Sequence, residues 1–259
     1  MMRAFGWTFA VACAAVTAAP VAAQDWNWRG RVAAGQWMEI KGVIGTVRAV
    51  AGTGSEVEVE VTKSARRSDP DEVNIVVVPH RDGITICAVY PQVRNREPND
   101  CQPGERGRSN ANDNDVNVNF LVRVPRGVNF AGRSVNGAVT ITGITGDVRA
   151  HTVNGSVRVS TSGLAEATTV NGSIDVAMGR ADWDAILEFE TVNGAITIEL
   201  PDNVDTEVHA STVNGSIASD YPLTIRGRFG PKRMSGTIGR GGRELALGTV
   251  NGDIEIRRR

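Results

Sequence analysis

The run NANDNDVNVN, from Asn110 to Asn119, holds the residues best suited to bind a metal ion. Asp113 and Asp115 alternate with asparagines, and closely spaced carboxylate and amide oxygens are the donors that Ca²⁺ takes in proteins. The run lacks the glycine and the distal glutamate of an EF-hand loop. Asn and Asp also favour the turn that leads into a strand. Two interpretations stay open, a calcium site at Asp113 and Asp115 or a simple turn, and we expect no other cofactor.

Two cysteines, Cys87 and Cys101, remain if the N-terminal segment is removed. An even pair of cysteines in an exported chain predicts a disulfide. The residues between them are polar and include Pro91 and Pro98, so this loop cannot bury a core of its own. Zinc binding is the poorer alternative, because no histidine or third cysteine lies at ligand spacing.

Residue types that could catalyse a reaction are scattered along the chain. No Ser-His-Asp spacing, P-loop or dinucleotide fingerprint is present. His80, His151 and His209 share no ligand spacing, which favours solvated or strand-edge histidines. Arg158 and Asp175 occupy equivalent repeat positions and predict an ion pair between neighbouring strands. We predict no catalytic residue; the alternative is a glycan-processing lyase or hydrolase of the β-helix type, with acids on one face.

The elements that must position these residues follow from a repeat. The tripeptide Val-Asn-Gly recurs in the second half of the chain, and most repeats lie about 20 residues apart, as in stacked repeat architectures. We expect each Asn-Gly pair to form a corner. There Gly accepts a left-handed or tight backbone, and the Asn side chains hydrogen-bond along the stack. The predicted structural corner residues are Asn136, Gly137, Asn154, Gly155, Asn171, Gly172, Asn193, Gly194, Asn214, Gly215, Asn251 and Gly252.

Residues on either side of each corner predict strands. The third and fifth residues after Asn are mostly Val or Ile, as at Val139 and Ile141, and the residue before Asn is Val. We expect these three positions to face the core and the Thr or Ser two places before Asn to face outward. Ile44 takes the Asn position in an earlier unit, and Ser235 takes it in a degenerate unit within the longest gap. ITGDVRA, at 144–150, predicts a second flat side in each unit.

This pattern predicts an all-β fold, a parallel β-solenoid of stacked coils of about 20 residues with Val-Asn-Gly corners. Antiparallel hairpins at each Asn-Gly are the alternative. We expect a single domain over 37–259, with a disulfide-tied loop insertion at 92–115. Residues 24–36 are expected to form an N-terminal cap segment. Trp26 and Trp28, with Trp37, would cover the end of the core.

The first 23 residues are typical of a secretory signal peptide. Arg3 precedes an apolar run, and small residues precede a predicted cleavage between Ala23 and Gln24. The run is short for a membrane span, so we expect no transmembrane span after signal removal. Lipidation at Cys13 is an open alternative. We predict export to the periplasm or outer cell surface. The formal net charge of -1 argues against a nucleic-acid partner.

The chain resembles the bacterial "putative adhesin" family of exported β-solenoid domains, whose function is unknown. The resemblance is carried by MEIKGVIGTVRA, VRVPRGVNF, the serial TVNGSI and TVNGAI units and LGTVNGDIEIRR, which together extend over about 37–259. It implies surface adhesion and supplies no catalytic residues. The loop between Cys87 and Cys101 and the degenerate unit at 234–239 depart from the family pattern.

Together these observations predict an exported, non-enzymatic, adhesin-like structural or binding protein of the bacterial envelope. Its expected partner is an envelope or surface glycan or protein, contacted along a flat, repetitive face. Self-association through edge strands is also open. A third interpretation is an envelope-sensing module that binds a protein partner through the loop at 92–115.

Overall fold

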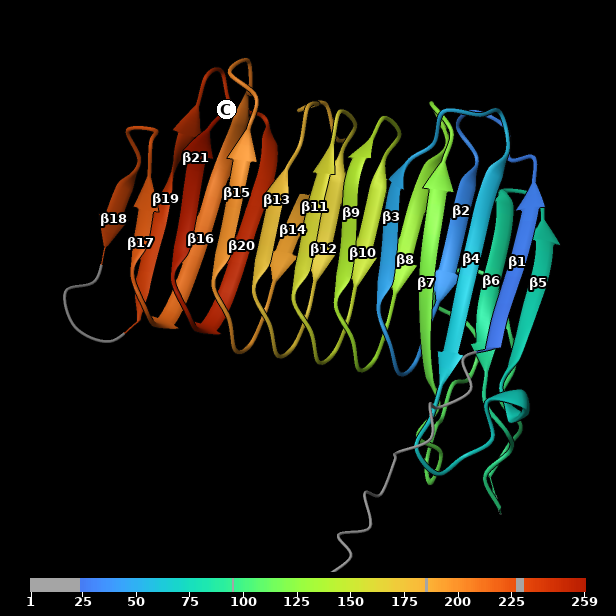
Figure 1. Cartoon of the computed structure of the whole chain (residues 1–259). Helices are drawn as coiled ribbons and strands as arrows, with labels where there is room; N and C mark the ends of the chain where they lie inside the picture. The colour runs from blue at the N-terminus through green and yellow to red at the C-terminus, as the bar shows by residue number, and fades with distance from the viewer. Residues whose placement is uncertain (1–23, 95, 185, 227–230) are drawn as a thin grey trace, which may run out of the picture.

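The computed structural model describes residues 24–94, 96–184, 186–226 and 231–259 (Figure 1). These residues form an all-β protein of two large, mostly parallel sheets and one short 3-10 helix, η1 (Pro70–Glu72). None of the described helical residues belongs to a segment long and apolar enough to cross a membrane. The predicted signal peptide at 1–23, with Cys13, lies outside the described residues, and its cleavage stays a prediction.

We call the two sheets A and B and give their strands in spatial order. Sheet A contains β1 (Gln24–Gly30), β4 (Val57–Ser64), β7 (Asn117–Val124), β3 (Val47–Ala51), β9 (Val139–Ile144), β11 (Val157–Thr161), β13 (Ile174–Ala177), β15 (Ile196–Leu200), β21 (Ile254–Arg258) and β17 (Ile217–Ser219). Sheet B contains β18 (Thr224–Arg226), β19 (Lys232–Ile238), β16 (Thr206–Asn214), β20 (Arg243–Asn251), β14 (Ile186–Glu190), β12 (Ala165–Thr168), β10 (Val148–His151), β8 (Asn129–Arg133), β2 (Trp37–Lys41), β6 (Gly83–Val89) and β5 (Asn74–His80).

Successive strands of the repeat alternate between the two sheets. β9 and β11 lie in sheet A, and β10 and β12 lie in sheet B. Each pairs in parallel with the strand two places along the chain, so Val139 lies beside Val157 and Val157 beside Ile174. Equal repeat positions are therefore neighbours, and the second flat side predicted from ITGDVRA is β10.

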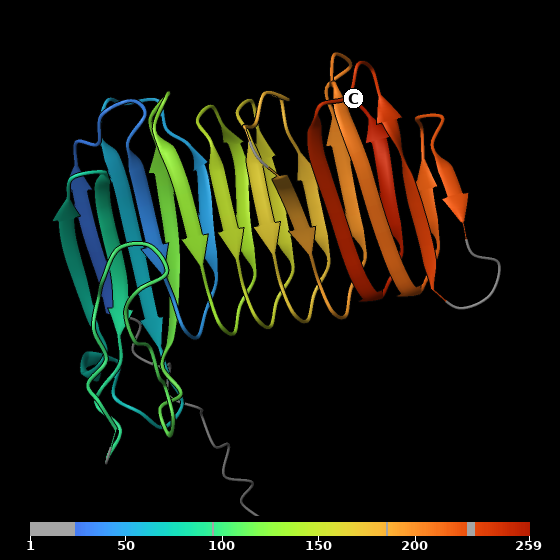
Figure 2. The same ribbon diagram turned by 180° about the vertical axis from the view of Figure 1, so that it is seen from behind.

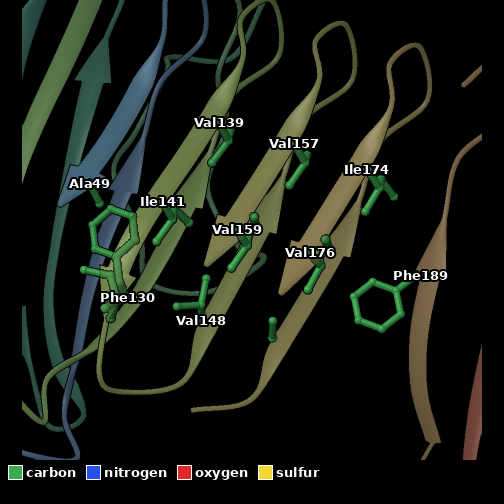
Figure 3. Close-up of a cluster of buried hydrophobic side chains, with 14 of the residues drawn as sticks. Ala49, Phe130, Val139, Ile141, Val148, Val157, Val159, Ile174, Val176 and Phe189 are labelled. Atoms are coloured by element: carbon green, nitrogen blue, oxygen red, sulfur yellow. The ribbon is translucent and has the colours of Figure 1, made fainter. Parts of the chain in front are cut away.

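The core fills the space between the sheets (Figure 3). Sheet A contributes the third and fifth residues after Asn, such as Val139 and Ile141, and sheet B contributes Phe130, Val148 and Phe189; all five are buried. Full burial of such a side chain stabilises the fold by about 1.5–3 kcal/mol. A single unit cannot bury both of its flat sides, so its stability depends on its neighbours.

The prediction that Val before each Asn faces the core is wrong for most units, although Val135 in the first unit is partly buried against the core. Val192 is 41% exposed, whereas Thr191 is 5% exposed. The in-out alternation continues from the preceding strand of sheet B, where Phe189 points inward. Thr191 and Ile196 both point inward although they lie five positions apart, an odd number, whereas inward residues of one extended strand lie an even number apart. The corner therefore reverses the parity that a single extended strand would have kept.

The repeat glycines serve close stacking, and of the two backbones expected at the corner, left-handed or tight, the left-handed one does not occur at them. None of the six repeat glycines, all within the described residues, has a positive φ. A Cβ at Gly172 would lie closer than 3.0 Å to the carbonyl oxygen of Gly155 in the neighbouring unit, and each other repeat glycine meets a neighbouring glycine in the same way. The corner backbones approach too closely for any side chain.

The last repeat unit is inserted out of sequence order. β20 lies between β14 and β16, and β21 lies between β15 and β17 (red strands among orange ones in Figure 1). Ser235, predicted at an Asn position, instead lies in β19, which runs antiparallel to β16. Arg240, five residues later, cannot enter an apolar core, and its guanidinium binds Asp205 at 2.8 Å on the surface. The degenerate unit is therefore not one of the stacked repeats.

Antiparallel strands form the N-terminal end of both sheets. β1 pairs with β4, β4 with β7, and β5 with β6, all antiparallel. Trp26 and Trp28 are half-buried and pack against the core here. Trp37 does not join them, because it faces outward from sheet B and stacks against Arg149.

Candidate functional site

The asparagines of the corners form a hydrogen-bonded column. Asn154 donates from Nδ2 to Oδ1 of Asn136 at 2.9 Å, Asn171 donates to Asn154 at 2.8 Å, and Asn251 donates to Asn193 at 2.7 Å. A side-chain amide can donate one hydrogen bond and accept another, so each Asn inside the column bonds to the Asn on either side of it. These groups are committed to stacking and offer no reactive atom.

The segment between β6 and β7 crosses the outer face of sheet B at its N-terminal end (green in Figure 2). A disulfide between Cys87 and Cys101 ties it to β6. The ammonium group of Lys41, on β2, donates hydrogen bonds to the carbonyl oxygens of Gln102 at 2.5 Å and Arg106 at 2.7 Å. Burial lowers the pKa of Lys41. The predicted loop insertion is thus held down against the sheet.

A buried carboxylate joins this loop to the sheet. Glu39 of β2 is 5% exposed, and its Oε2 accepts hydrogen bonds from Thr85 at 2.8 Å and from the backbone of Gly104 at 2.9 Å. Arg133 Nε lies 3.3 Å from Glu39 Oε1 but makes no hydrogen bond with acceptable geometry, so this pairing is electrostatic. Losing one partner of such a buried pair costs several kcal/mol, roughly 3–5.

Beside Glu39, sheet and loop enclose a hollow of about 520 Å³. We call it the loop hollow and define it by Trp37 and four arginines, Arg81, Arg106, Arg133 and Arg149; the carboxylates of Glu39, Asp82 and Glu105 also line it. Arg149 lies 4.5 Å from the centre of the Trp37 ring. Among the residues the structure describes, Arg81 and Arg106 have no carboxylate within salt-bridge distance. Arg133 is paired with Glu39 and Glu105, and Arg149 with Glu166. Of the four guanidinium groups, those of Arg81 and Arg106 are therefore the ones left to bind a carboxylate, sulfate or phosphate group.

The three histidines lie apart on sheet B. His151 is half-buried, and its Nδ1 lies 2.6 Å from the hydroxyl of Thr168. Burial, followed by the positive charge of Arg133, lowers the pKa of His151. His80, which lines the loop hollow, lies 3.2 Å from the hydroxyl of Thr85. Across the described ranges, no three His, Cys, Asp or Glu side chains are grouped to hold a metal ion.

The calcium candidates lie in a turn that leads into β7. Asp115 accepts hydrogen bonds from the backbone of Ser68 at 2.9 Å and of Arg67 at 3.3 Å. The bond from Ser68 is the main reason that the pKa of Asp115 falls to about 2. Asp113 has a left-handed φ of 61°, as the turn interpretation allows. Calcium binding at the pair stays a prediction.

The outer face of sheet A carries the expected ion pair. Arg158 and Asp175 are register partners on β11 and β13, with Nε and Oδ2 3.4 Å apart. Both side chains are more than half exposed, so the pair contributes at most about 1 kcal/mol. The repeat columns of this face contain no cluster of acids.

Sequence reasoning missed the loop hollow. Its residues come from β2, β8, β10, the turn between β5 and β6, and the loop, and none belongs to a Val-Asn-Gly corner. One signal was available, because Glu39 and Arg133 each occupy outward positions of strands that precede a corner. Their proximity depends on the pairing of β2 with β8, which links residues far apart in sequence.

The fold and hollow define a class of protein, an all-β protein of two facing, mostly parallel sheets with a loop-covered polar hollow on one outer face. Residues 131–257 of this chain match the family described as Toastrack DUF4097. This match confirms the resemblance to an adhesin-like domain of unknown function.

Solved structures with a similar chain course come from several bacteria. A protein of Clostridium sporogenes described as a "putative cell adhesion protein" is 12% identical, with a TM-score of 0.44, and covers 91% of this chain and 100% of its own. A "putative adhesin" of Bacteroides fragilis is 13% identical, with a TM-score of 0.40, and covers 90% and 97%. No curated protein matches this chain.

Proposed function

We propose that this protein is an exported, adhesin-like binding module that acts without catalysis, built as a parallel β-solenoid. The observation that carries the proposal is the loop hollow, a polar site held in place by a disulfide and by the buried Glu39 on rigid strands. Export to the periplasm or outer surface would supply the oxidising environment that a disulfide needs.

The ligand we propose is an anionic envelope or surface polymer. Arg81 and Arg106 stand free at the rim of the loop hollow, within the described part of the chain. Trp37 adds an aromatic face of the kind that packs against sugar rings, here already partnered by Arg149. Repeated anionic groups on one polymer would engage several such proteins and raise the avidity of weak single contacts.

The direct test is binding of residues 24–259 to an array of glycans and envelope polymers, with and without calcium, with product analysis of every hit. We expect binding to sulfated, phosphorylated or carboxylated polymers without cleavage. Cleavage of a hit would overturn the non-enzymatic assignment. Loss of binding on calcium removal would place the contact at Asp113 and Asp115 instead. Absence of binding to every polymer on the array would contradict the polymer proposal and favour a protein partner.

A further inference from the structure

A second hollow lies on the outer face of sheet B, far along the stack from the loop hollow. Its volume is about 830 Å³. β14 forms one wall and β19 the other, with β20 and β16 between them. The outward residues of β20 here are Ala246 and Gly248, which leave the floor low. We call this hollow the C-terminal groove.

One wall of the C-terminal groove is acidic. Glu188 and Glu190 alternate on β14, so both point outward on the same face. Neither carboxylate has a salt-bridge partner among the described residues. The negative charge of Glu190, followed by burial, raises the pKa of Glu188. Two neighbouring carboxylates without a cation are poorly stabilised in the free protein.

The opposite wall is basic. Arg226 of β18 and Arg233 of β19 are direct register partners on antiparallel strands. Like charges at such positions destabilise a sheet. Neither arginine pairs with an acid within the described ranges, and no residue outside those ranges is acidic. Both guanidinium groups are therefore without a counter-charge in the described part of the chain.

The register fixes how far apart the two walls lie. Glu190 is the register partner of Gly248, Gly248 that of Ser211, and Ser211 that of Arg233, on four neighbouring strands. Three strand spacings separate the backbones of Glu190 and Arg233, about 14 Å in all. An extended peptide covers that distance with about four residues. His209 and Ser211 lie between the walls and can hydrogen-bond a backbone that crosses them.

We propose that the C-terminal groove binds a short extended peptide with a free amino end and a free carboxyl end. The ammonium contacts Glu188 and Glu190, the carboxylate contacts Arg226 and Arg233, and the backbone crosses the low floor of Ala246 and Gly248. This site is separate from the loop hollow and does not depend on it. Ligand binding relieves the repulsion within both like-charge pairs.

The probe is tetra-alanine, titrated into residues 24–259 by calorimetry at low salt. We expect millimolar or tighter binding, and a loss of about fivefold when the peptide is N-acetylated or C-amidated. Dialanine is too short to reach both walls and should bind more weakly by a similar factor. Added salt should weaken binding, because the contacts are between exposed charges.

Variants assign each peptide end to its wall. In Arg226→Ala/Arg233→Ala, amidation of the peptide should no longer matter while acetylation still does. In Glu188→Gln/Glu190→Gln, acetylation of the peptide should no longer matter while amidation still does. Arg158→Ala on sheet A is the matched control and should bind as the wild type does. All of these side chains are exposed, and unchanged thermal unfolding would show that the variants fold.

Three results would overturn the proposal: no binding of tetra-alanine at millimolar concentration, equal binding of the capped peptides, or equal sensitivity of both double variants to both caps. The groove variants should leave polymer binding on the array unchanged. Failure of this inference is therefore distinguishable from failure of the proposed function.

Discussion

The hydroxyl of Thr152 donates a hydrogen bond of 2.8 Å to the carbonyl oxygen of Gly137, the corner glycine of the neighbouring unit. The same bond joins Thr169 to Gly155 at 2.9 Å and Thr249 to Gly194 at 3.0 Å. It explains why Thr or Ser recurs two places before Asn and why that residue is buried.

Replacing Thr152 by Val should therefore destabilise the protein although the side-chain shape is kept. The Gly137 carbonyl loses its hydroxyl donor, and we expect a loss of about 1–2 kcal/mol in the free energy of unfolding. Urea unfolding measures it. Thr140→Val is the matched control, because Thr140 faces outward from sheet A with no side-chain hydrogen bond in the described structure. Equal effects of the two variants would contradict the assigned bond.

Gly172→Ala tests the close stacking of the corners. Its Cβ would overlap the Gly155 carbonyl, and forced separation of packed groups costs about 1–3 kcal/mol. Gly54→Ala is the control, because a Cβ there meets only one atom, 4.0 Å away. We expect a large fall in the unfolding midpoint for the first variant and little change for the second. A tolerated Gly172→Ala would refute the stacking explanation.

Reducing the Cys87–Cys101 disulfide should release the loop before the sheets unfold. The cross-link closes 14 residues, and loops of this size gain about 3 kcal/mol from closure in the chain-entropy model. We expect trypsin to cut at Arg106 or Arg108 much faster after reduction. Cutting at equal rates in both redox states would show that Lys41 and Glu39 hold the loop without the disulfide.

His151 should make stability depend on pH in a defined direction. Its pKa is lowered in the folded state, so the unfolded chain takes up a proton first as pH falls. The contribution is complete above the unfolded value near 6.5 and is lost as pH falls below it. We therefore expect the wild type to lose more stability than His151→Gln between about pH 7.5 and about pH 5. Parallel pH profiles would contradict this.

Much of the sheet arrangement follows from the repeat alone. Equal columns such as Val139, Val157 and Ile174 become neighbours because parallel strands of stacked units share one register. The sequence pattern could not predict that Val192 points outward and Thr191 inward, because a corner can add one residue and so reverse the alternation of inward and outward side chains. A single sequence shows the types in each column but not the path of the backbone between them.

Spatial order and the two hollows were harder to predict for another reason. The position of β20 between β14 and β16 arises from pairings across 186–251, which no local pattern reports. Likewise, Glu39 meets Arg133, and Glu190 comes level with Arg233, only through strand register. Sites built by long-range pairing need the structure.

The most direct test of the central claim, that the loop hollow is the binding surface, is a titration of the strongest array ligand against three proteins. These are the wild type, Arg81→Glu/Arg106→Glu, and Arg158→Glu on sheet A as the matched charge control. The account predicts that the double variant loses at least about tenfold in affinity while the control stays within about twofold. Equal losses in both variants, or full binding by the double variant, would contradict it.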